Sequence, residues 1–143
     1  MQKKTIFITG TTGSMGGAGL TAVLQRTDRF DLVTLARPSL KNKAQMRQYS
    51  KEAGLKVIWG DLTNYEDVLQ CVTDADYVSH PAALVTPTVD HDPVNARRIN
   101  VDSIENIVRA IKAQPDPGSI KLVNIGSVAM TGDRLYQGYE QLP

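Results

Sequence analysis

The sequence predicts an α/β domain built on a doubly wound parallel sheet of about five strands. Two observations carry this prediction. Short apolar runs rich in β-branched residues alternate five times with segments of helical periodicity, and only short links separate them. Parallel neighbours need crossover connections, so this alternation places helices on both faces of the sheet. The 143 residues are enough for one domain with a single continuous core.

Each expected strand is a short run that polar or turn-forming residues bound. The first, Thr5-Ile6-Phe7-Ile8, leads directly into a glycine-rich turn. Pro38 ends the second, because proline cannot donate to a central ladder. The other four strands are expected at residues 31–35, 57–59, 76–79 and 120–125.

The segments between the strands carry helical signals. Gly54 stands where a helix would end. Asn64 is expected to be the N-cap of a later helix, with Glu66 and Asp67 in its first turn. Four helices are therefore expected at about residues 18–26, 41–53, 65–72 and 93–112. The last is expected to bury a stripe made by Ile99, Ser103, Ile107 and Ala110.

The turn after the first strand, residues 10–16, carries a glycine at every third position. Gly10 permits a tight turn, Gly13 lets backbone amides approach a ligand, and Gly16 lets the next helix pack close to the sheet. The start of that helix offers unpaired N–H groups and a partial positive charge. The turn therefore predicts a site for the pyrophosphate of a dinucleotide. The expected contacts are Gly10, Thr12, Gly13 and the backbone of Ser14 and Met15.

Composition excludes several other classes of function. The formal net charge of +1 and the absence of a basic stripe argue against nucleic acid and acidic membranes as partners. No apolar run approaches the roughly 20 residues that span a bilayer, and no signal region opens the chain, so a cytoplasmic protein is expected. Cys71 is interpreted as a small buried hydrophobe. Neither His80 nor His91 has a second ligand at a metal-like spacing, so no metal is expected.

The glycine spacing resembles the Thr-Gly-x-x-Gly-x-x-Gly turn of the short-chain dehydrogenase/reductase superfamily, starting here at Thr9. Four further segments, in the same order, resemble the extended branch of that superfamily, the NAD-dependent epimerase/dehydratase family. They are Gly60-Asp61-Leu62, His80-Pro81-Ala82-Ala83, Asn100-Val101-Asp102-Ser103 and Ile125-Gly126-Ser127-Val128. The resemblance implies that residues 1–143 are the N-terminal part of a Rossmann-type dinucleotide-binding domain, without the C-terminal substrate-binding part.

The resemblance also implies roles for particular residues. Asp61 and Leu62 would meet the adenine, and Ala82 and Ala83 would pack beside the ribose and nicotinamide half of the cofactor. Asn100, which opens the long helix, joins the expected cofactor-binding residues. Ser127 would be a catalytic residue that binds the hydroxyl or carbonyl of the substrate.

The end of the second strand favours NADP over NAD. An NAD site of this type has an acidic residue there that accepts from the adenosine ribose. This sequence has Ala36-Arg37-Pro38-Ser39 instead, and Asp31 lies at the wrong end of the strand. Arg37 is suited to pair with a 2′-phosphate through two hydrogen bonds, although a solvated charge at a strand end is the alternative.

The family's proton-transfer pair, a tyrosine with a lysine four positions later, is absent from the chain. Tyr136 is followed at that distance by Glu140, and Tyr139 by Pro143. The resemblance places the pair further downstream, so this chain is expected to be inactive and the full-length protein to be an enzyme.

Two functions stay open at this point. The first is an oxidoreductase, or a nucleotide-sugar epimerase or dehydratase, that acts by hydride transfer on a small molecule. The second is a non-catalytic NAD(P)-binding sensor of the same fold, because a fold does not determine a function. The resemblance also leaves a homodimer open, since family dimers use helices near the fifth strand.

Overall fold

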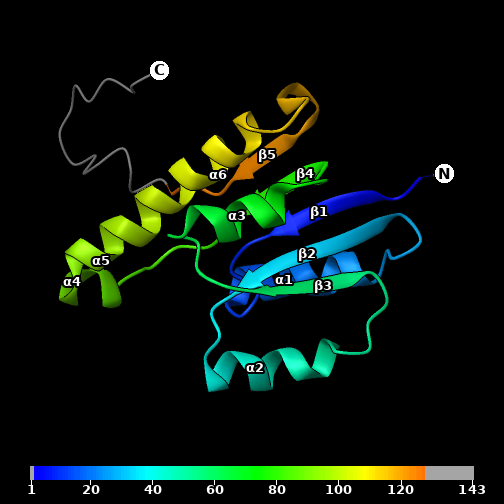
Figure 1. The fold of residues 1–143 in the computed structure, drawn as a ribbon. Helices are drawn as coiled ribbons and strands as arrows, with labels where there is room; N and C mark the ends of the chain where they lie inside the picture. Colours follow the sequence, from blue (N-terminus) through cyan, green and yellow to red (C-terminus); the bar gives the residue numbers. More distant parts are fainter. Residues whose placement is uncertain (1, 128–143) are drawn as a thin grey trace, which may run out of the picture.

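The computed structural model describes residues 2–127, which form a parallel sheet with helices on both faces (Figure 1). The order of the strands across the sheet is β3-β2-β1-β4-β5, and all four pairs of neighbours are parallel. The predicted fold class is therefore confirmed. The strands are β1 (Lys4–Ile8), β2 (Phe30–Ala36), β3 (Leu55–Trp59), β4 (Tyr77–His80) and β5 (Lys121–Asn124).

Helical segments connect each strand to the next. Between β1 and β2 lies α1 (Ser14–Leu24). Between β2 and β3 lies α2 (Leu40–Met46), which is followed by a 3₁₀ turn at Arg47–Tyr49. Between β3 and β4 lies α3 (Tyr65–Val72). Between β4 and β5 the chain forms α4 (Thr88–His91), α5 (Pro93–Arg97), a π turn (Arg98–Asp102), α6 (Ser103–Lys112) and a 3₁₀ turn (Pro117–Ser119).

Alternating strand residues build two separate cores, one on each face of the sheet. In β1, Phe7 faces one core and Ile8 the other, as the period of two requires. The core around Ile8 contains Leu20 of α1 and Met46 of α2. The core around Phe7 contains buried residues of α3 and α6, and Figure 1 shows these two helices together on that face. They are Val68, Cys71, Val72, Ile107, Ala110 and Ile111.

The predicted helix over residues 41–53 is wrong in its second half. The α-helix ends at Met46, and the 3₁₀ turn that follows ends at Tyr49. Met46 is buried and Tyr49 is half-buried, whereas every residue from Ser50 to Gly54 is exposed. Those residues have no large apolar side chain to place against the sheet, and good helix propensity alone does not hold a helix in water.

The predicted helix over residues 93–112 is present but is not a regular α-helix throughout. A π turn at Arg98–Asp102 separates α5 from α6. π turns are rare and are frequently found at functional sites. The expected buried stripe is confirmed at Ser103, Ile107 and Ala110, which lie in α6, whereas Ile99 lies in the π turn and is only half-buried.

The strand order predicts where a ligand crevice lies on the sheet. The chain winds outward from β1 through β2 to β3, and then crosses back to β4 on the other side of β1. Ligands of such sheets bind beyond the carboxyl ends of the strands at this switch point. The turn after β1 and the loop after β4 therefore flank the expected site.

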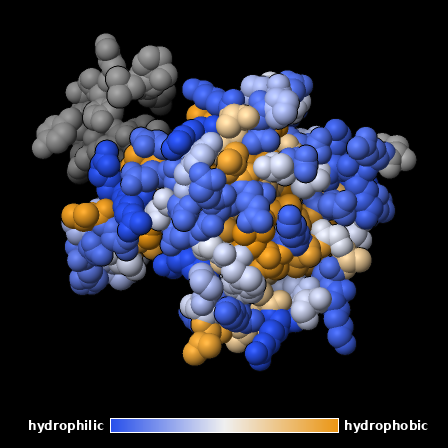
Figure 2. Space-filling view, in the orientation of Figure 1, coloured by the Kyte–Doolittle hydropathy of each residue, from blue (hydrophilic) through white to orange (hydrophobic). Residues whose placement is uncertain are grey.

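Hydrophilic residues cover most of the face shown in Figure 2, with apolar residues visible over part of the sheet and at the end of the molecule formed by α4 and α5. At that end, Val94 is 80% exposed. Within residues 2–127, no helix is both long and apolar enough to cross a bilayer.

Candidate functional site

The turn after β1 lies against the loop after β4. Gly10 has a φ of +65°, a conformation that favours glycine. A Cβ at Gly10 would stand 3.0 Å from Cα of Ala82. The two loops that flank the switch point therefore lie close together, and a side chain at Gly10 would crowd Ala82 and strain the backbone.

The other two glycines of the turn bring α1 close to β1. The N–H of Gly13 donates to the carbonyl of Gly10 at 2.9 Å, which closes the turn. A Cβ at Gly16 would overlap the carbonyl oxygen of Gly10. Gly16 is fully enclosed by this packing, as its predicted role requires.

The start of α1 has the character of an anion site. Its N-cap residue is Gly13, so no side chain caps the helix, and no acidic residue lies in its first turn. The first helical backbone bond runs from Gly17 N–H to Gly13 O, which places the N–H groups of Ser14, Met15 and Gly16 ahead of that bond. Ser14 and Met15 are exposed. Backbone donors and the positive end of the helix dipole therefore meet at the carboxyl edge of the sheet, beside the switch point.

Buried threonines on both sides of Gly10 hold the turn through side-chain contacts that were not predicted from the sequence. Thr11 Oγ1 lies 2.6 Å from Thr34 Oγ1, which in turn donates to the carbonyl of Ile8 at 3.0 Å. From outside the turn, Gln45 Nε2 of α2 donates to the carbonyl of Thr12 at 3.3 Å. The only sequence signal for these contacts is the run of threonines around the first glycine.

His80 is part of a buried hydrogen-bonded network at the end of β4. Its Nδ1 lies 2.9 Å from Thr9 Oγ1, and its Nε2 lies 3.3 Å from Ser103 Oγ of α6. The Thr9 hydroxyl oxygen also accepts from the N–H of Ala82 at 3.2 Å. Burial lowers the pKa of His80 below its usual value. His80 therefore joins the end of β4 to the residue that follows β1 and to the first residue of α6.

Hydrogen bonds from α3 and α6, and within the loop itself, hold the loop after β3. The N–H of Asp61 donates to Asp67 Oδ2 at 2.9 Å, and a Cβ at Gly60 would overlap that carboxylate oxygen. Asn106 Nδ2 of α6 donates to the carbonyl of Leu62 at 3.0 Å. Asp61 Oδ1 accepts from both the N–H and the hydroxyl of Thr63, each at 2.8 Å. Asp61 and Leu62 are thus half-buried and rigidly placed next to the carboxyl end of β3.

The loop after β4 contains the expected residues Ala82 and Ala83. Ala82 contacts the glycine turn, and Ala83 is exposed. The side chain of Asn100, in the π turn, accepts from Leu84 N–H at 2.7 Å and donates to Leu84 O at 2.9 Å. Asn100 therefore holds the shape of the loop that carries the two alanines.

Arg37 follows β2 directly and its side chain is exposed. The backbone beside it is fixed, because Asn42 Nδ2 donates to the carbonyl of Arg37 at 2.9 Å. Ser39 is the N-cap of α2, and its hydroxyl oxygen accepts from Asn42 N–H at 3.1 Å. The ammonium nitrogen Nζ of Lys43 lies 6.0 Å from the centre of the Trp59 ring. This edge of the crevice is thus cationic, with no acidic side chain between residues 36 and 46.

Ser127, the expected catalytic serine, is exposed and lies just beyond β5. The strand is tied to its neighbour there by a bond from Ile125 N–H to His80 O at 3.3 Å. Tyr136, Tyr139 and Glu140 lie outside the described residues. The predicted residues after β1, β2, β3, β4 and β5 thus gather at one edge of the sheet, and within residues 2–127 no cluster of side chains suited to a metal ion accompanies them.

Comparison with known proteins agrees with this arrangement. The model of the "NAD dependent epimerase/dehydratase family" matches residues 6–142. UDP-glucose 4-epimerases of Rickettsia bellii and Rickettsia felis are both 36% identical to the chain over 110 residues, which is 75% of this chain and 32% of theirs. The chain thus spans about a third of the length of these relatives.

Solved structures show the same fold. Pen from Bacillus thuringiensis matches with a TM-score of 0.70 and 25% identity, over 79% of this chain and 35% of that one. WbmH of Bordetella bronchiseptica, in complex with NAD⁺, matches with a TM-score of 0.72 and 22% identity, over 92% of this chain and 41% of that one. The resemblance to the extended short-chain dehydrogenases/reductases is therefore confirmed, and the chain belongs to the NAD-dependent epimerase/dehydratase family.

Proposed function

We propose that this chain binds a nicotinamide dinucleotide and is the cofactor-binding part of an epimerase or dehydratase that acts on a nucleotide sugar. The contact between Gly10 and Ala82 at the switch point carries the proposal. It places the uncapped start of α1 beside the loop after β4, so that one ligand can span both. The 36% identity to UDP-glucose 4-epimerases supports a nucleotide sugar as the substrate class.

The residues present fit such a cofactor. The backbone of Gly10, Thr12, Gly13, Ser14 and Met15 would hold the pyrophosphate, because N–H groups and the helix dipole favour a negative charge there. Asp61 and Leu62 would contact the adenine. Ala82 and Ala83, on the loop that Asn100 holds, would pack beside the nicotinamide half.

The bound nicotinamide would supply hydride transfer, and Ser127 would hold the reacting hydroxyl or carbonyl of the substrate. The 143 residues contain no tyrosine with a lysine four positions later. This chain by itself therefore lacks the pair that transfers the proton in the family, and we expect it to bind cofactor without turning over substrate.

Arg37 favours NADP as the cofactor. Its side chain is exposed at the end of β2, and Lys41 and Lys43 follow it without any intervening carboxylate. A 2′-phosphate would find positive charge there, whereas the ribose hydroxyls of NAD would find no acidic acceptor on this segment. The structure of WbmH is a complex with NAD⁺, so the preference for NADP is a specific claim about this chain.

Calorimetric titration of the chain with NADP⁺ and NAD⁺ tests both parts of the proposal. We expect both to bind and NADP⁺ to bind more tightly, with the Arg37→Ala variant losing about tenfold in affinity for NADP⁺ alone. Lys51→Ala, which removes a cation outside this segment, is the matched control. Lack of binding at millimolar ligand would refute the function, and an unchanged preference in Arg37→Ala would refute the role of Arg37.

A further inference from the structure

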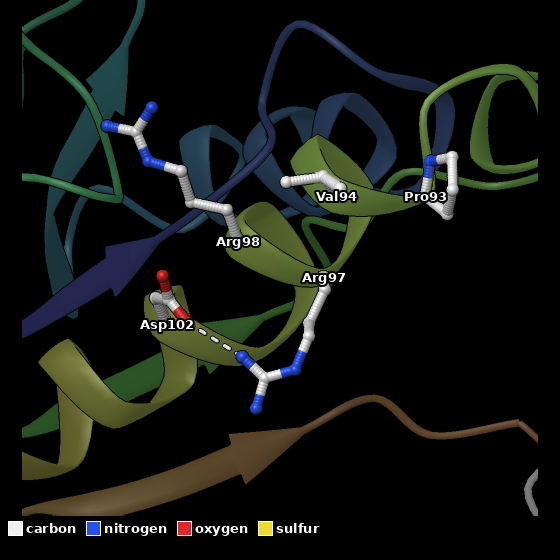
Figure 3. A pocket seen from close by; sticks show the side chains of 5 residues that line it. All are labelled: Pro93, Val94, Arg97, Arg98 and Asp102. Atoms are coloured by element: carbon white, nitrogen blue, oxygen red, sulfur yellow. Dashed lines mark ion pairs between the residues drawn. The ribbon is translucent and has the colours of Figure 1, made fainter.

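One side chain of the π turn reaches the loop after β3. Arg98 Nη2 donates to Thr63 Oγ1 at 3.1 Å, across 35 positions of sequence. In Figure 3 the side chain of Arg98 points toward the segment that follows β3. The neighbouring Arg97 points to the other side, where it pairs with Asp102 at 3.9 Å.

The contact determines which way the Thr63 hydroxyl points. A guanidinium only donates, so the oxygen of Thr63 must accept from Arg98. The hydroxyl proton is then directed to Asp61 Oδ1, which lies 2.8 Å away. Oδ1 also accepts from the N–H of Thr63 at 2.8 Å. Two donors therefore hold one oxygen of the Asp61 carboxylate and fix the plane of the group.

The second oxygen of the same carboxylate is left for another donor. Asp61 Oδ2 has no hydrogen-bond partner among residues 2–127, although Asp61 is half-buried. An oriented acceptor at the edge of a ligand crevice recognises a donor more strongly than a rotating one, since the ordering cost is met before binding.

We propose that Arg98 is a positioning residue for the adenine half of the cofactor, acting through Thr63 to aim Asp61 Oδ2 at the exocyclic amine of the base. This inference rests on the proposed function. It assigns Arg98 and Thr63, neither of which touches the cofactor in this arrangement, to the selection of adenine. It also gives the π turn a role, because Arg98 begins it and Asn100, two residues later, holds the loop after β4.

Adenosine diphosphate and inosine diphosphate test the inference. Both carry the ribose and pyrophosphate, but inosine presents a carbonyl oxygen where adenine presents the amine. We expect the unmodified chain to bind ADP at least about tenfold more tightly than IDP, which is the strength of a hydrogen bond to a charged acceptor. In Arg98→Met the ratio should fall to about threefold or less, because Asp61 is no longer held.

Matched variants separate positioning from stability. Arg97→Met removes an equal charge from the adjacent position and should keep the full ratio. Thr63→Val removes the hydroxyl and should lower the ratio as Arg98→Met does, whereas Thr63→Ser should retain it. A general loosening of the fold would weaken both ligands together and leave the ratio unchanged, so the ratio is the diagnostic readout.

Each other outcome overturns the inference. If Arg98→Met and Thr63→Val keep the ratio of the unmodified chain, or if Arg97→Met loses it equally, Arg98 does not position Asp61. If the unmodified chain binds ADP and IDP equally, Asp61 does not select the base, while the proposed function stands. If neither binds at millimolar concentration, the proposed function fails and this inference with it.

Discussion

Gly16 and Gly19 lie one turn apart in α1, yet they meet opposite constraints. A Cβ at Gly16 would overlap the carbonyl oxygen of Gly10, whereas a Cβ at Gly19 would meet only Ile8 Cδ1 at 3.8 Å. We predict that Gly16→Ala lowers the free energy of unfolding by about 3 kcal/mol, at the upper end of overpacking effects, because backbone must move. Gly19→Ala should instead raise it by about 0.5–1 kcal/mol through helix propensity. Urea unfolding of both variants measures this, and equal effects would contradict the packing described for the turn.

His80 makes the stability of the domain sensitive to mild acid. Burial lowers its pKa in the folded chain below the ordinary value of 6.5, so the unfolded chain binds the proton more readily. The free energy of unfolding should therefore be constant above about pH 7 and fall as the pH drops from 6.5 toward the folded pKa. Urea unfolding between pH 5 and 8 measures the slope, which His80→Gln should reduce and His91→Gln, on exposed α4, should not.

Asp76 does not interfere with that measurement. Burial raises the pKa of its carboxyl, but hydrogen bonds from Lys4 and from the N–H of Thr5, with the charge of Lys4, lower it to below 3.8 overall. The stability it provides is present above that ordinary value and is lost only as the pH falls through the still lower folded pKa. A slope between pH 5 and 6.5 that persists in His80→Gln would thus need a different titrating group.

At the scale of elements, the start of α3 depends on one side chain. Asn64 Oδ1 accepts from Glu66 N–H at 2.9 Å and from Asp67 N–H at 3.4 Å, which confirms the N-cap predicted from the sequence. We predict that Asn64→Ala lowers the free energy of unfolding by about 1 kcal/mol. Asn64→Asp keeps an acceptor oxygen and should stay within a few tenths of the unmodified chain. Thermal or urea unfolding compares the two, and an equal loss in both would show that the cap is not the cause.

The sequence pattern predicted those helices and strands whose structure depends on interactions between residues close together in the chain. The five strands and the start of α3 follow from apolar runs, turn residues and a cap. The second half of the predicted 41–53 helix failed because helix propensity there is not matched by burial beyond Tyr49. The π turn was not predicted, since the bonds that Arg98 and Asn100 make from it reach Thr63 and Leu84, which lie far away in sequence.

The same distinction holds for the site. Spacing identified the glycine turn, because Gly10, Gly13 and Gly16 act within one turn of chain. The contacts that support it join residues far apart, such as Thr9 with His80 across 71 positions and Thr11 with Thr34 across 23. Such pairs follow from the strand order, which places β1 between β2 and β4, and no local spacing reveals them.

At the scale of the whole molecule, the two edges of the sheet differ in what they gather. The carboxyl edge gathers the glycine turn, the loop after β3 and the loop after β4. The opposite edge is closed by structural contacts, among them Lys4 Nζ to Asp76 Oδ1 at 2.6 Å and Lys121 N–H to Asp76 O at 3.0 Å. A ligand that binds as proposed should therefore affect the two edges unequally.

Hydrogen exchange with and without NADP⁺ tests this asymmetry. Amides that exchange by local opening are slowed only where the ligand touches the segment that opens, by a factor that grows with ligand concentration over its dissociation constant. We predict slower exchange at residues 13–16, 61–63 and 82–84, and unchanged exchange in the loops 25–29 and 73–76 at the opposite edge. A ligand concentration about 100 times the dissociation constant stabilises by about 2.7 kcal/mol, which gives a slowing of about 100-fold. Equal slowing at both edges would mean that the ligand acts only by opposing global unfolding, and slowing confined to residues 25–29 and 73–76 would place the ligand at the wrong end of the sheet.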